Sequence, residues 1–112
     1  MIEGVQTREE NGKTIVDIAA QHIDFRNAQQ LKSFVANLYE AGHRYVLLNL
    51  GQVGFMDSSG LSVLLIGQRS ADEHQGTFAV YGVQGYVNNL IELTHLNRVI
   101  PICQTEQEAL EK

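Results

Sequence analysis

The chain has 112 residues, of which 44% are hydrophobic and 19% charged, so it is long enough for one domain with a hydrophobic core and is not composed like a disordered protein. Its net charge of −5 provides no basic surface for nucleic acid or for an anionic membrane. Because it has neither a signal-peptide-like start nor a run of about 18 apolar residues, we expect a single cytoplasmic domain over residues 1–112.

The first elements form a predicted β-hairpin. Residues 2–8 and 14–20 have strand-like patterns, and Asn11 and Gly12 lie between them. An Asn-Gly pair readily adopts the positive φ angles of a tight two-residue turn, so the two strands should be antiparallel.

A helix and a buried strand follow. Asp24 is a suitable helix N-cap, and apolar residues from Phe25 to Leu38 recur at helical spacing before Gly42 ends the helix. Residues 45–50 are almost continuously apolar, which is typical of a strand that is buried on both faces. We therefore expect this strand at the centre of the sheet.

The second half of the chain alternates helices and strands. A helix with a wide apolar face begins near Ser58 and ends before Gly76, and it should pack deeply against the sheet. The remaining elements are a strand over residues 77–81, a helix over 86–94, a strand over 99–102 and a short helix whose start, Thr105 to Glu108, matches a capping box.

The resulting order, ββαβαβαβα, predicts an α/β fold. Its mixed β-sheet should be antiparallel at the N-terminal hairpin and then be extended by parallel strands through right-handed βα crossovers. In such sheets the loops that leave the carboxyl ends of the parallel strands form the functional edge. The loop that contains Ser58 lies at this edge, and the loop that contains Asp24 joins it if the strand over 14–20 is parallel to the strand over 45–50.

The most informative segment is residues 56–61, with the sequence MDSSGL. It places the hydroxyls of Ser58 and Ser59 at the start of a helix, where unpaired backbone N–H groups favour an anion. An exposed serine there is a candidate for phosphorylation, and the added charge would repel a docked partner. The alternative is that Asp57 or Ser58 only caps the helix.

Apolar residues flank the two serines. Phe55 and Met56 could either contact a partner or anchor the loop to the core, whereas for Leu61 we expect anchoring. If Asp24 and Asp57 both lie near the phosphate, their charges would add to its negative field and increase the repulsion of a partner.

Other kinds of site have little support in the sequence. The four histidines are scattered without the close pairs of zinc sites, and the single cysteine, Cys103, lies among apolar residues as a packed thiol does. We expect no metal, no cofactor and no catalytic activity. A hydrolase that acts through Ser58 would need a base, for which His22 is the nearest candidate, and the nucleophile-elbow pattern would need glycine where Met56 stands.

Three segments resemble the STAS domains, and among them the bacterial anti-sigma factor antagonists. They are Gln21 to Asp24 before the first helix, residues 55–61 around the serines, and residues 93–97 after the third helix. The resemblance covers nearly the whole chain. Two positions depart from it: Ser62 replaces the second glycine of the Gly-Leu-Gly pattern, and Gln21 stands where the family often has glycine.

The resemblance implies the STAS fold and a partner-switching function. In that family the unphosphorylated antagonist binds an anti-sigma factor and thereby frees a sigma factor for transcription. The anti-sigma factor would also be a serine kinase of the histidine-kinase-like ATPase type, which phosphorylates Ser58, or as second choice Ser59, and so ends the complex. A metal-dependent PP2C-type phosphatase would reset the switch. The partner-binding loop would comprise Asp24, Met56, Asp57, Ser59, Gly60 and Leu61.

Two other functions remain open. A STAS module can act as a scaffold or accessory subunit, for example in a stress-signalling assembly or a lipid transporter, without any phosphate on Ser58. A small serine hydrolase is a different class, and ester turnover that is lost in Ser58→Ala would support it.

Overall fold

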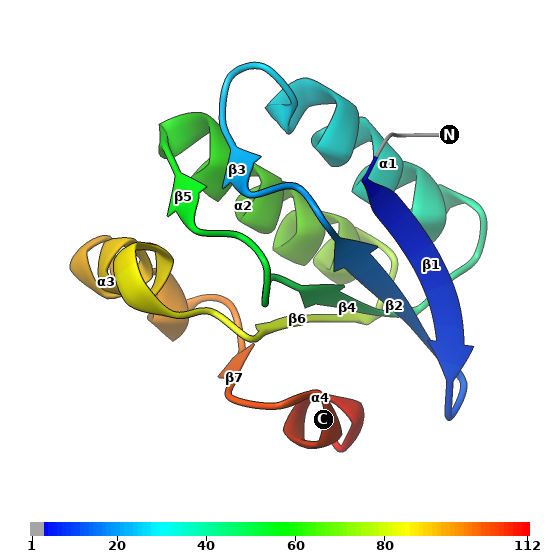
Figure 1. Ribbon diagram of the computed structural model, residues 1–112. Coiled ribbons are helices and arrows are strands. Elements are labelled where there is room, and N and C mark those ends of the chain that lie inside the picture. Colours follow the sequence, from blue (N-terminus) through cyan, green and yellow to red (C-terminus); the bar gives the residue numbers. More distant parts are fainter. Residues whose placement is uncertain (1–3) are drawn as a thin grey trace.

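The computed structural model describes residues 4–112. Five strands form one sheet in the order β1-β2-β4-β6-β7, in which β1 is antiparallel to β2 and every other neighbouring pair is parallel (Figure 1). This confirms the predicted mixed sheet, with the strand over 45–50 at its centre. The strands are β1 (Val5–Glu10), β2 (Lys13–Ile18), β4 (Tyr45–Asn49), β6 (Thr77–Tyr81) and β7 (Ile102–Cys103).

The long helices cover one face of this sheet. In Figure 1, α1 and α2 run side by side above it, α4 lies on the opposite face, and α3 projects to one side. Within residues 4–112, no helix is both long and apolar enough to cross a membrane. The helices are α1 (Ala28–Glu40), α2 (Ser58–Glu73), α3 (Gly85–Leu93), α4 (Glu106–Leu110) and one 3-10 turn (Leu96–Arg98).

The predicted order of elements holds for this framework, and two short strands are added to it. β3 (His22–Ile23) and β5 (Phe55–Met56) form a separate two-stranded parallel sheet. Neither strand was predicted, because two residues are too few to show an alternating pattern.

The predicted hairpin is confirmed. Asn11 and Gly12 both have positive φ, at 53° and 78°, and the strands on either side pair antiparallel. The predicted first strand began at residues 2 and 3, which lie outside the described residues, and its observed end is Glu10 rather than residue 8.

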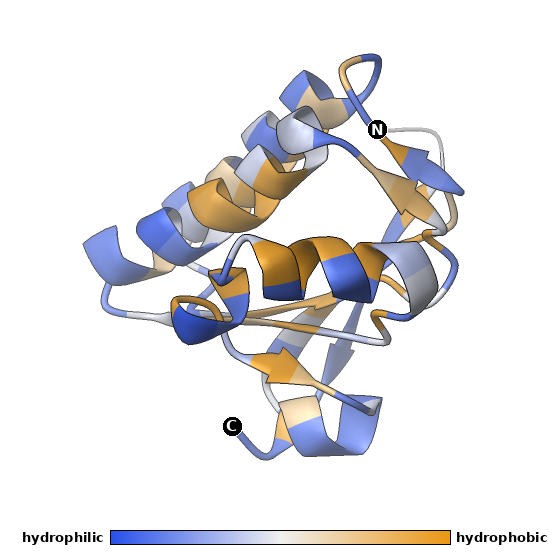
Figure 2. Cartoon of the chain, turned by 90° about the vertical axis from the view of Figure 1, so that its left-hand side faces the viewer, coloured by the Kyte–Doolittle hydropathy of each residue, from blue (hydrophilic) through white to orange (hydrophobic). Residues whose placement is uncertain are grey.

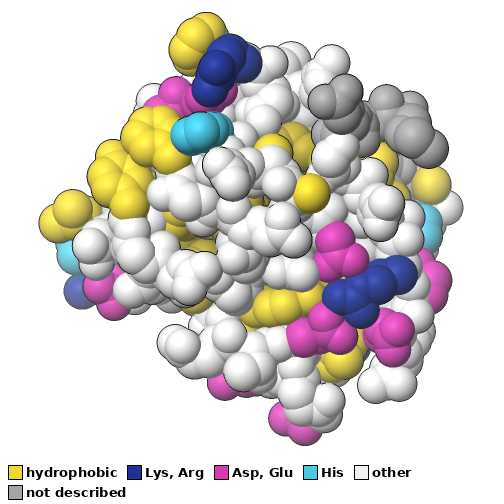
Figure 3. Space-filling view, viewed as in Figure 1, with side chains coloured by type: hydrophobic (Ala, Val, Ile, Leu, Met, Phe, Trp, Pro, Cys, Tyr) yellow, Lys and Arg dark blue, Asp and Glu magenta, His cyan; other side chains and the backbone are white. Residues whose placement is uncertain are grey.

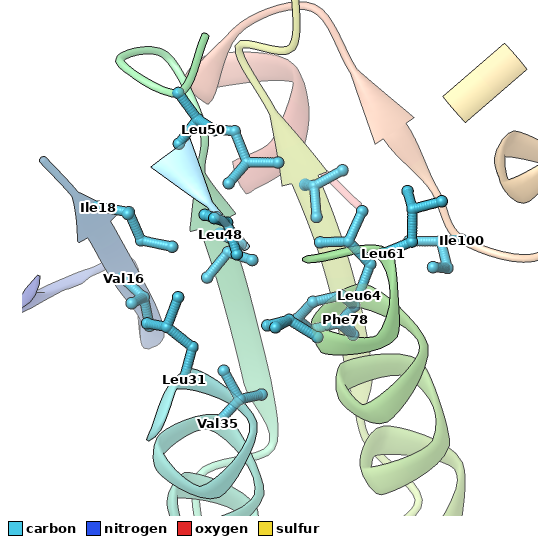
Figure 4. Packing of buried hydrophobic residues seen from close by; sticks show 14 of the residues in the cluster. Val16, Ile18, Leu31, Val35, Leu48, Leu50, Leu61, Leu64, Phe78 and Ile100 are labelled. Carbon is cyan, nitrogen blue, oxygen red and sulfur yellow. The ribbon is translucent and has the colours of Figure 1, made fainter. Parts of the chain in front are cut away.

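The main core lies between the sheet and the α1–α2 layer. In Figure 2 the orange, hydrophobic residues of the helices face inward and the blue ones outward. α2 approaches the sheet closely at Gly67, where a Cβ atom would lie 2.3 Å from the Phe78 ring. Burial of each large aliphatic side chain stabilises such a core by about 1.5–3 kcal/mol. Figure 4 shows the packing of Val16, Ile18, Leu31, Val35, Leu48, Leu50, Leu61, Leu64, Phe78 and Ile100.

A smaller apolar cluster lies on the opposite face of the sheet, under α4. It contains Ile15, Leu47, Tyr81 and Cys103, so the cysteine is a packed thiol as predicted, and burial raises its pKa. Beside it, Arg8 forms ion pairs with carboxylates of β2 and α4.

The start of α1 differs from the prediction. The helix begins at Ala28 with Asn27 as N-cap, not at Asp24. Asp24 instead forms a turn, because its carboxylate accepts from the Arg26 backbone N–H at 3.0 Å and its carbonyl accepts from the Asn27 N–H at 3.1 Å. Phe25, expected on the buried helix face, therefore lies outside the helix and is 77% exposed.

Two further predictions need correction. The last strand is Ile102–Cys103 rather than residues 99–102, because the chain is still turning at Val99 and Ile100 after the 3-10 turn. On α2, Leu65 is 45% exposed, so the apolar face of this helix is wider than the part that packs against the core.

Candidate functional site

The small parallel sheet of β3 and β5 positions Ser58, which comes two residues after the end of β5. In that sheet Ile23 lies opposite Met56, and the Asp57 N–H donates to the Ile23 carbonyl at 3.4 Å. Parallel strands end at the same edge, so the chain leaves both strands next to each other. This brings the loop that contains Asp24 beside the loop that contains Ser58, as predicted for a β2 strand parallel to β4.

Asp57, and not Ser58, caps α2. Its backbone is extended, with φ −108° and ψ −169°, and its Oδ1 accepts from the Gly60 N–H at 3.1 Å. Ser58 is the first helical residue and is exposed, and among the described residues its hydroxyl has no hydrogen-bond partner. The capping function and the free hydroxyl are thus on two neighbouring residues.

Gly60 allows the first turn of α2 to press against both short strands. A Cβ atom at this position would lie 2.3 Å from Met56 Cγ and 2.5 Å from the Ile23 carbonyl oxygen. Met56 is fully buried, and Leu61 is 9% exposed. These side chains therefore position the loop. The interpretation of Met56 as a direct partner contact does not fit its burial.

The neighbouring loop presents a buried carboxylate that is paired with an exposed cation. Asp24 is only 6% exposed, and Arg26 binds its carboxylate through two nitrogens, Nη2 at 2.7 Å and Nε at 3.1 Å. These hydrogen bonds from Arg26 lower the pKa of Asp24 to about 2. The Arg26 side chain is 66% exposed.

The arrangement resembles known proteins over nearly the whole chain. The sequence model of the STAS domain matches residues 4–109. The chain belongs to the STAS domain family.

The chain is also similar to individual proteins of known sequence or structure. An anti-sigma-B factor antagonist of Listeria monocytogenes is 28% identical over 105 residues, which cover 93% of this chain and 91% of the relative. The structure of an anti-sigma-factor antagonist (STAS) domain protein from Planctomyces limnophilus has a TM-score of 0.82 at 28% identity and covers 96% of this chain and 94% of that protein. The phosphorylated form of the Bacillus cell fate determinant SpoIIAA has the same fold, with a TM-score of 0.70 at 16% identity, covering 96% of each chain.

In this STAS domain, aromatic side chains continue from the Ser58 loop across to α3. The rings of Phe55 and Tyr86 stack with centroids 5.3 Å apart, and the His22 ring lies 5.9 Å from Phe55. Phe55 is 38% exposed and Tyr86 52% exposed. On the left of Figure 3, hydrophobic groups form a row with histidine side chains next to it. We call Phe55 and Tyr86 the aromatic strip.

Sequence reasoning missed Arg26 and Tyr86. No pattern in the sequence links Tyr86 to Phe55, because the two residues meet only when α3 packs beside β5. Arg26 follows an aspartate by two residues, and this Asp-x-Arg spacing could have suggested a turn with an ion pair.

Two of the histidines contact polar groups of neighbouring elements or turns. Among the described residues, no group of three His, Cys, Asp or Glu side chains is placed to hold a metal ion. His43 Nδ1 lies 2.7 Å from the Thr14 hydroxyl, and His74 Nδ1 lies 2.9 Å from the Ser70 carbonyl, so each has a local packing role. Within residues 4–112, no hydrogen bond joins His22 to Ser58.

Proposed function

We propose that this STAS domain is an anti-sigma factor antagonist controlled by phosphorylation of Ser58. Its unphosphorylated form would bind an anti-sigma factor in the cytoplasm and free a sigma factor, without contacting nucleic acid itself. The observation that carries the proposal is the free, exposed Ser58 hydroxyl. Because Asp57 already caps α2, Ser58 can be modified without loss of the cap.

The modifying enzyme would be the anti-sigma factor itself, acting as a serine kinase of the histidine-kinase-like ATPase type. The Ser58 oxygen would attack the γ-phosphorus of ATP, ADP would leave, and a base of the kinase would take the hydroxyl proton. A PP2C-type phosphatase would hydrolyse the phosphoester and restore the hydroxyl. The STAS domain would be the substrate in both reactions and would contribute no catalytic group.

A protein partner also explains the surroundings of Ser58. The aromatic strip on one side and the exposed Leu65 on α2 provide apolar area that a docked protein would remove from water. Phosphorylation adds about 1.5–2 negative charges beside Asp57. If this weakens the complex by about 3 kcal/mol, its affinity falls on the order of a hundredfold.

The proposal predicts that Ser58 accepts one phosphate. Purified wild type, Ser58→Ala and Ser59→Ala would be incubated with ATP and the histidine-kinase-like serine kinase from the same cell, and intact masses and kinase binding followed together. We expect a gain of one phosphate in wild type and Ser59→Ala but not in Ser58→Ala, and loss of kinase binding only where phosphate is gained.

Other outcomes point to other functions. If no variant is phosphorylated and partner binding is unaffected by ATP, the domain is a scaffold or accessory subunit. If pure protein hydrolyses generic esters and Ser58→Ala does not, Ser58 is instead a nucleophile.

A further inference from the structure

The backbone around Arg26 is fixed relative to the start of α2. The Asp24 N–H donates to Asn27 Oδ1 at 3.0 Å, and Asn27 Nδ2 donates to the His22 carbonyl at 2.9 Å. The loop from β3 to α1 is thus closed by its own side chains. Because β3 is also paired with β5, Arg26 and Ser58 belong to one connected unit.

Only a few residues separate Arg26 and Ser58 from the contact between the two short strands. The Ile23 carbonyl contacts the Asp57 N–H, and the first turn of α2 packs on the same oxygen at Gly60. Ser58 follows Asp57, and consecutive Cα atoms are about 3.8 Å apart. On the other strand Asp24 follows Ile23, and Arg26 lies within the turn that the Asn27 N–H closes by donating to the Asp24 carbonyl at 3.1 Å.

The guanidinium can bind a second anion. Arg26 uses Nε and Nη2 on Asp24, while Nη1 has no hydrogen bond among the described residues. The side chain is 66% exposed, whereas the Asp24 side chain is 9% exposed, so the cation faces solvent and the carboxylate does not. A guanidinium donates two parallel hydrogen bonds to phosphate oxygens as readily as to a carboxylate.

We infer that Arg26 binds the phosphate of phosphorylated Ser58 and gives up part of its contact with Asp24 to do so. The inference rests on the proposal that Ser58 is the phosphoacceptor. A phosphate with up to two negative charges attracts the guanidinium more strongly than a carboxylate with one, at equal distance. Asp24 would keep the hydrogen bond from the Arg26 backbone N–H, so its burial stays compensated.

This exchange would make phosphorylation more than an addition of charge. Arg26 would turn from a solvent-facing position above Asp24 toward α2, and the surface offered to a partner would change on both loops at once. A partner that had contacted the Arg26 guanidinium would lose this contact as well as meeting the new charge.

The test uses full-length protein with phosphoserine incorporated at position 58 during translation, so that no kinase is needed. A crystal structure of this protein should show Arg26 nitrogens within hydrogen-bond distance of phosphate oxygens. In solution, a ³¹P NMR titration would give the second pKa of the phosphate, ordinarily about 6. We expect Arg26→Gln to raise this pKa by about half a unit, a threefold change in proton affinity.

Arg69→Gln is the matched control. Arg69 is an exposed arginine on α2 that pairs with Glu73, and its position 11 residues after Ser58 places it about 16 Å along the helix. This variant should leave the phosphate pKa unchanged. All variants retain His22, Asp24 and Asp57, the other titratable side chains of the two loops that meet at Ser58.

The inference is overturned if Arg26→Gln and Arg69→Gln give the same phosphate pKa, or if Arg26 stays on Asp24 while the phosphate faces solvent. Neither result would bear on whether a kinase modifies Ser58. Conversely, failure of the kinase experiment would leave the measured pairing intact.

Discussion

The start of α2 requires glycine at position 60, because the packing leaves no room for a side chain there. Met56 Cγ and the Ile23 carbonyl oxygen occupy the space that a Cβ atom would fill, and the backbone oxygen cannot move without separating β3 from α2. The position of Ser58 therefore depends on Gly60, a neighbour that would take no part in the proposed phosphorylation.

Gly60→Ala should destabilise the fold by about 1–3 kcal/mol, the usual cost of forcing extra volume into a packed site. Urea denaturation followed by circular dichroism measures this change. Gly54→Ala is the matched control, because a Cβ atom there would lie 4.0 Å from its nearest neighbour, the Gln21 carbonyl oxygen. Equal urea midpoints for the two variants would show that the loop can shift to accommodate a methyl group at position 60, and would contradict the expected destabilisation.

At single positions, the sequence could predict which residue types gather at the site. It could not predict which of them caps a helix and which is buried. Both Asp24 and Asn27 are suitable N-caps, and only the turn formed by the Asp24 side chain decides for Asn27. Met56 could be exposed or buried as far as its neighbours in sequence show. Its burial follows from the approach of α2, a contact that involves residues far apart in the chain.

Among the elements, α2 both supports the core and presents Ser58 at its first residue. Its cap, Asp57, and the proposed phosphoacceptor, Ser58, are adjacent residues, so their contributions can be separated by mutation. Loss of the Asp57 carboxylate leaves the Gly60 N–H without its acceptor, whereas loss of the Ser58 hydroxyl removes no hydrogen bond within the described residues.

Asp57→Ala should lower the free energy of unfolding by about 1 kcal/mol, within the 0.5–2 kcal/mol range of helix caps. Ser58→Ala should change it by less than about 0.5 kcal/mol, as a surface substitution does. Thermal and urea unfolding of both variants provide the measurement. A larger loss in Ser58→Ala than in Asp57→Ala would contradict the assignment of the cap.

Long elements were predictable because each repeats its pattern several times. α2 and the buried β4 have enough apolar residues to define a period, and the Asn11–Gly12 turn fixes the hairpin through its positive φ angles. The two-residue strands β3 and β5 have no such signal. Their pairing arises only after β2 and β4 lie parallel and bring the following loops together.

In the whole molecule, ion pairs join the hairpin to the C-terminal helix. Arg8 on β1 binds Asp17 on β2 at 2.7 Å and Glu106 on α4 at 2.5 Å, and the Tyr81 hydroxyl donates to Glu106 at 2.8 Å. Hydrogen bonds from Arg8 lower the pKa of both carboxyl groups. α4 is thereby held over the smaller apolar cluster.

These lowered pKa values make the fold sensitive to acid. A carboxyl group whose pKa is lower in the folded state contributes stability that is complete above its unfolded value, 3.8 for Asp17 and 4.5 for Glu106, and is lost as the pH falls further. Urea midpoints should therefore drop between pH 5 and pH 3. The Arg8→Gln variant should be less stable than wild type at pH 7, and its urea midpoint should drop less between pH 5 and pH 3. An equal drop in the two proteins would contradict this account.

The aromatic strip, which under the proposed function would face a partner, lies on β5 and α3, while the five-stranded sheet carries the main core. Phe55 and Tyr86 are exposed and contribute little to the interior, so their replacement costs the fold little. After gene duplication, copies of this domain could thus diverge in the protein they recognise while folding equally well. Parallel signalling pathways within one cell could be kept apart by changes at a few such positions.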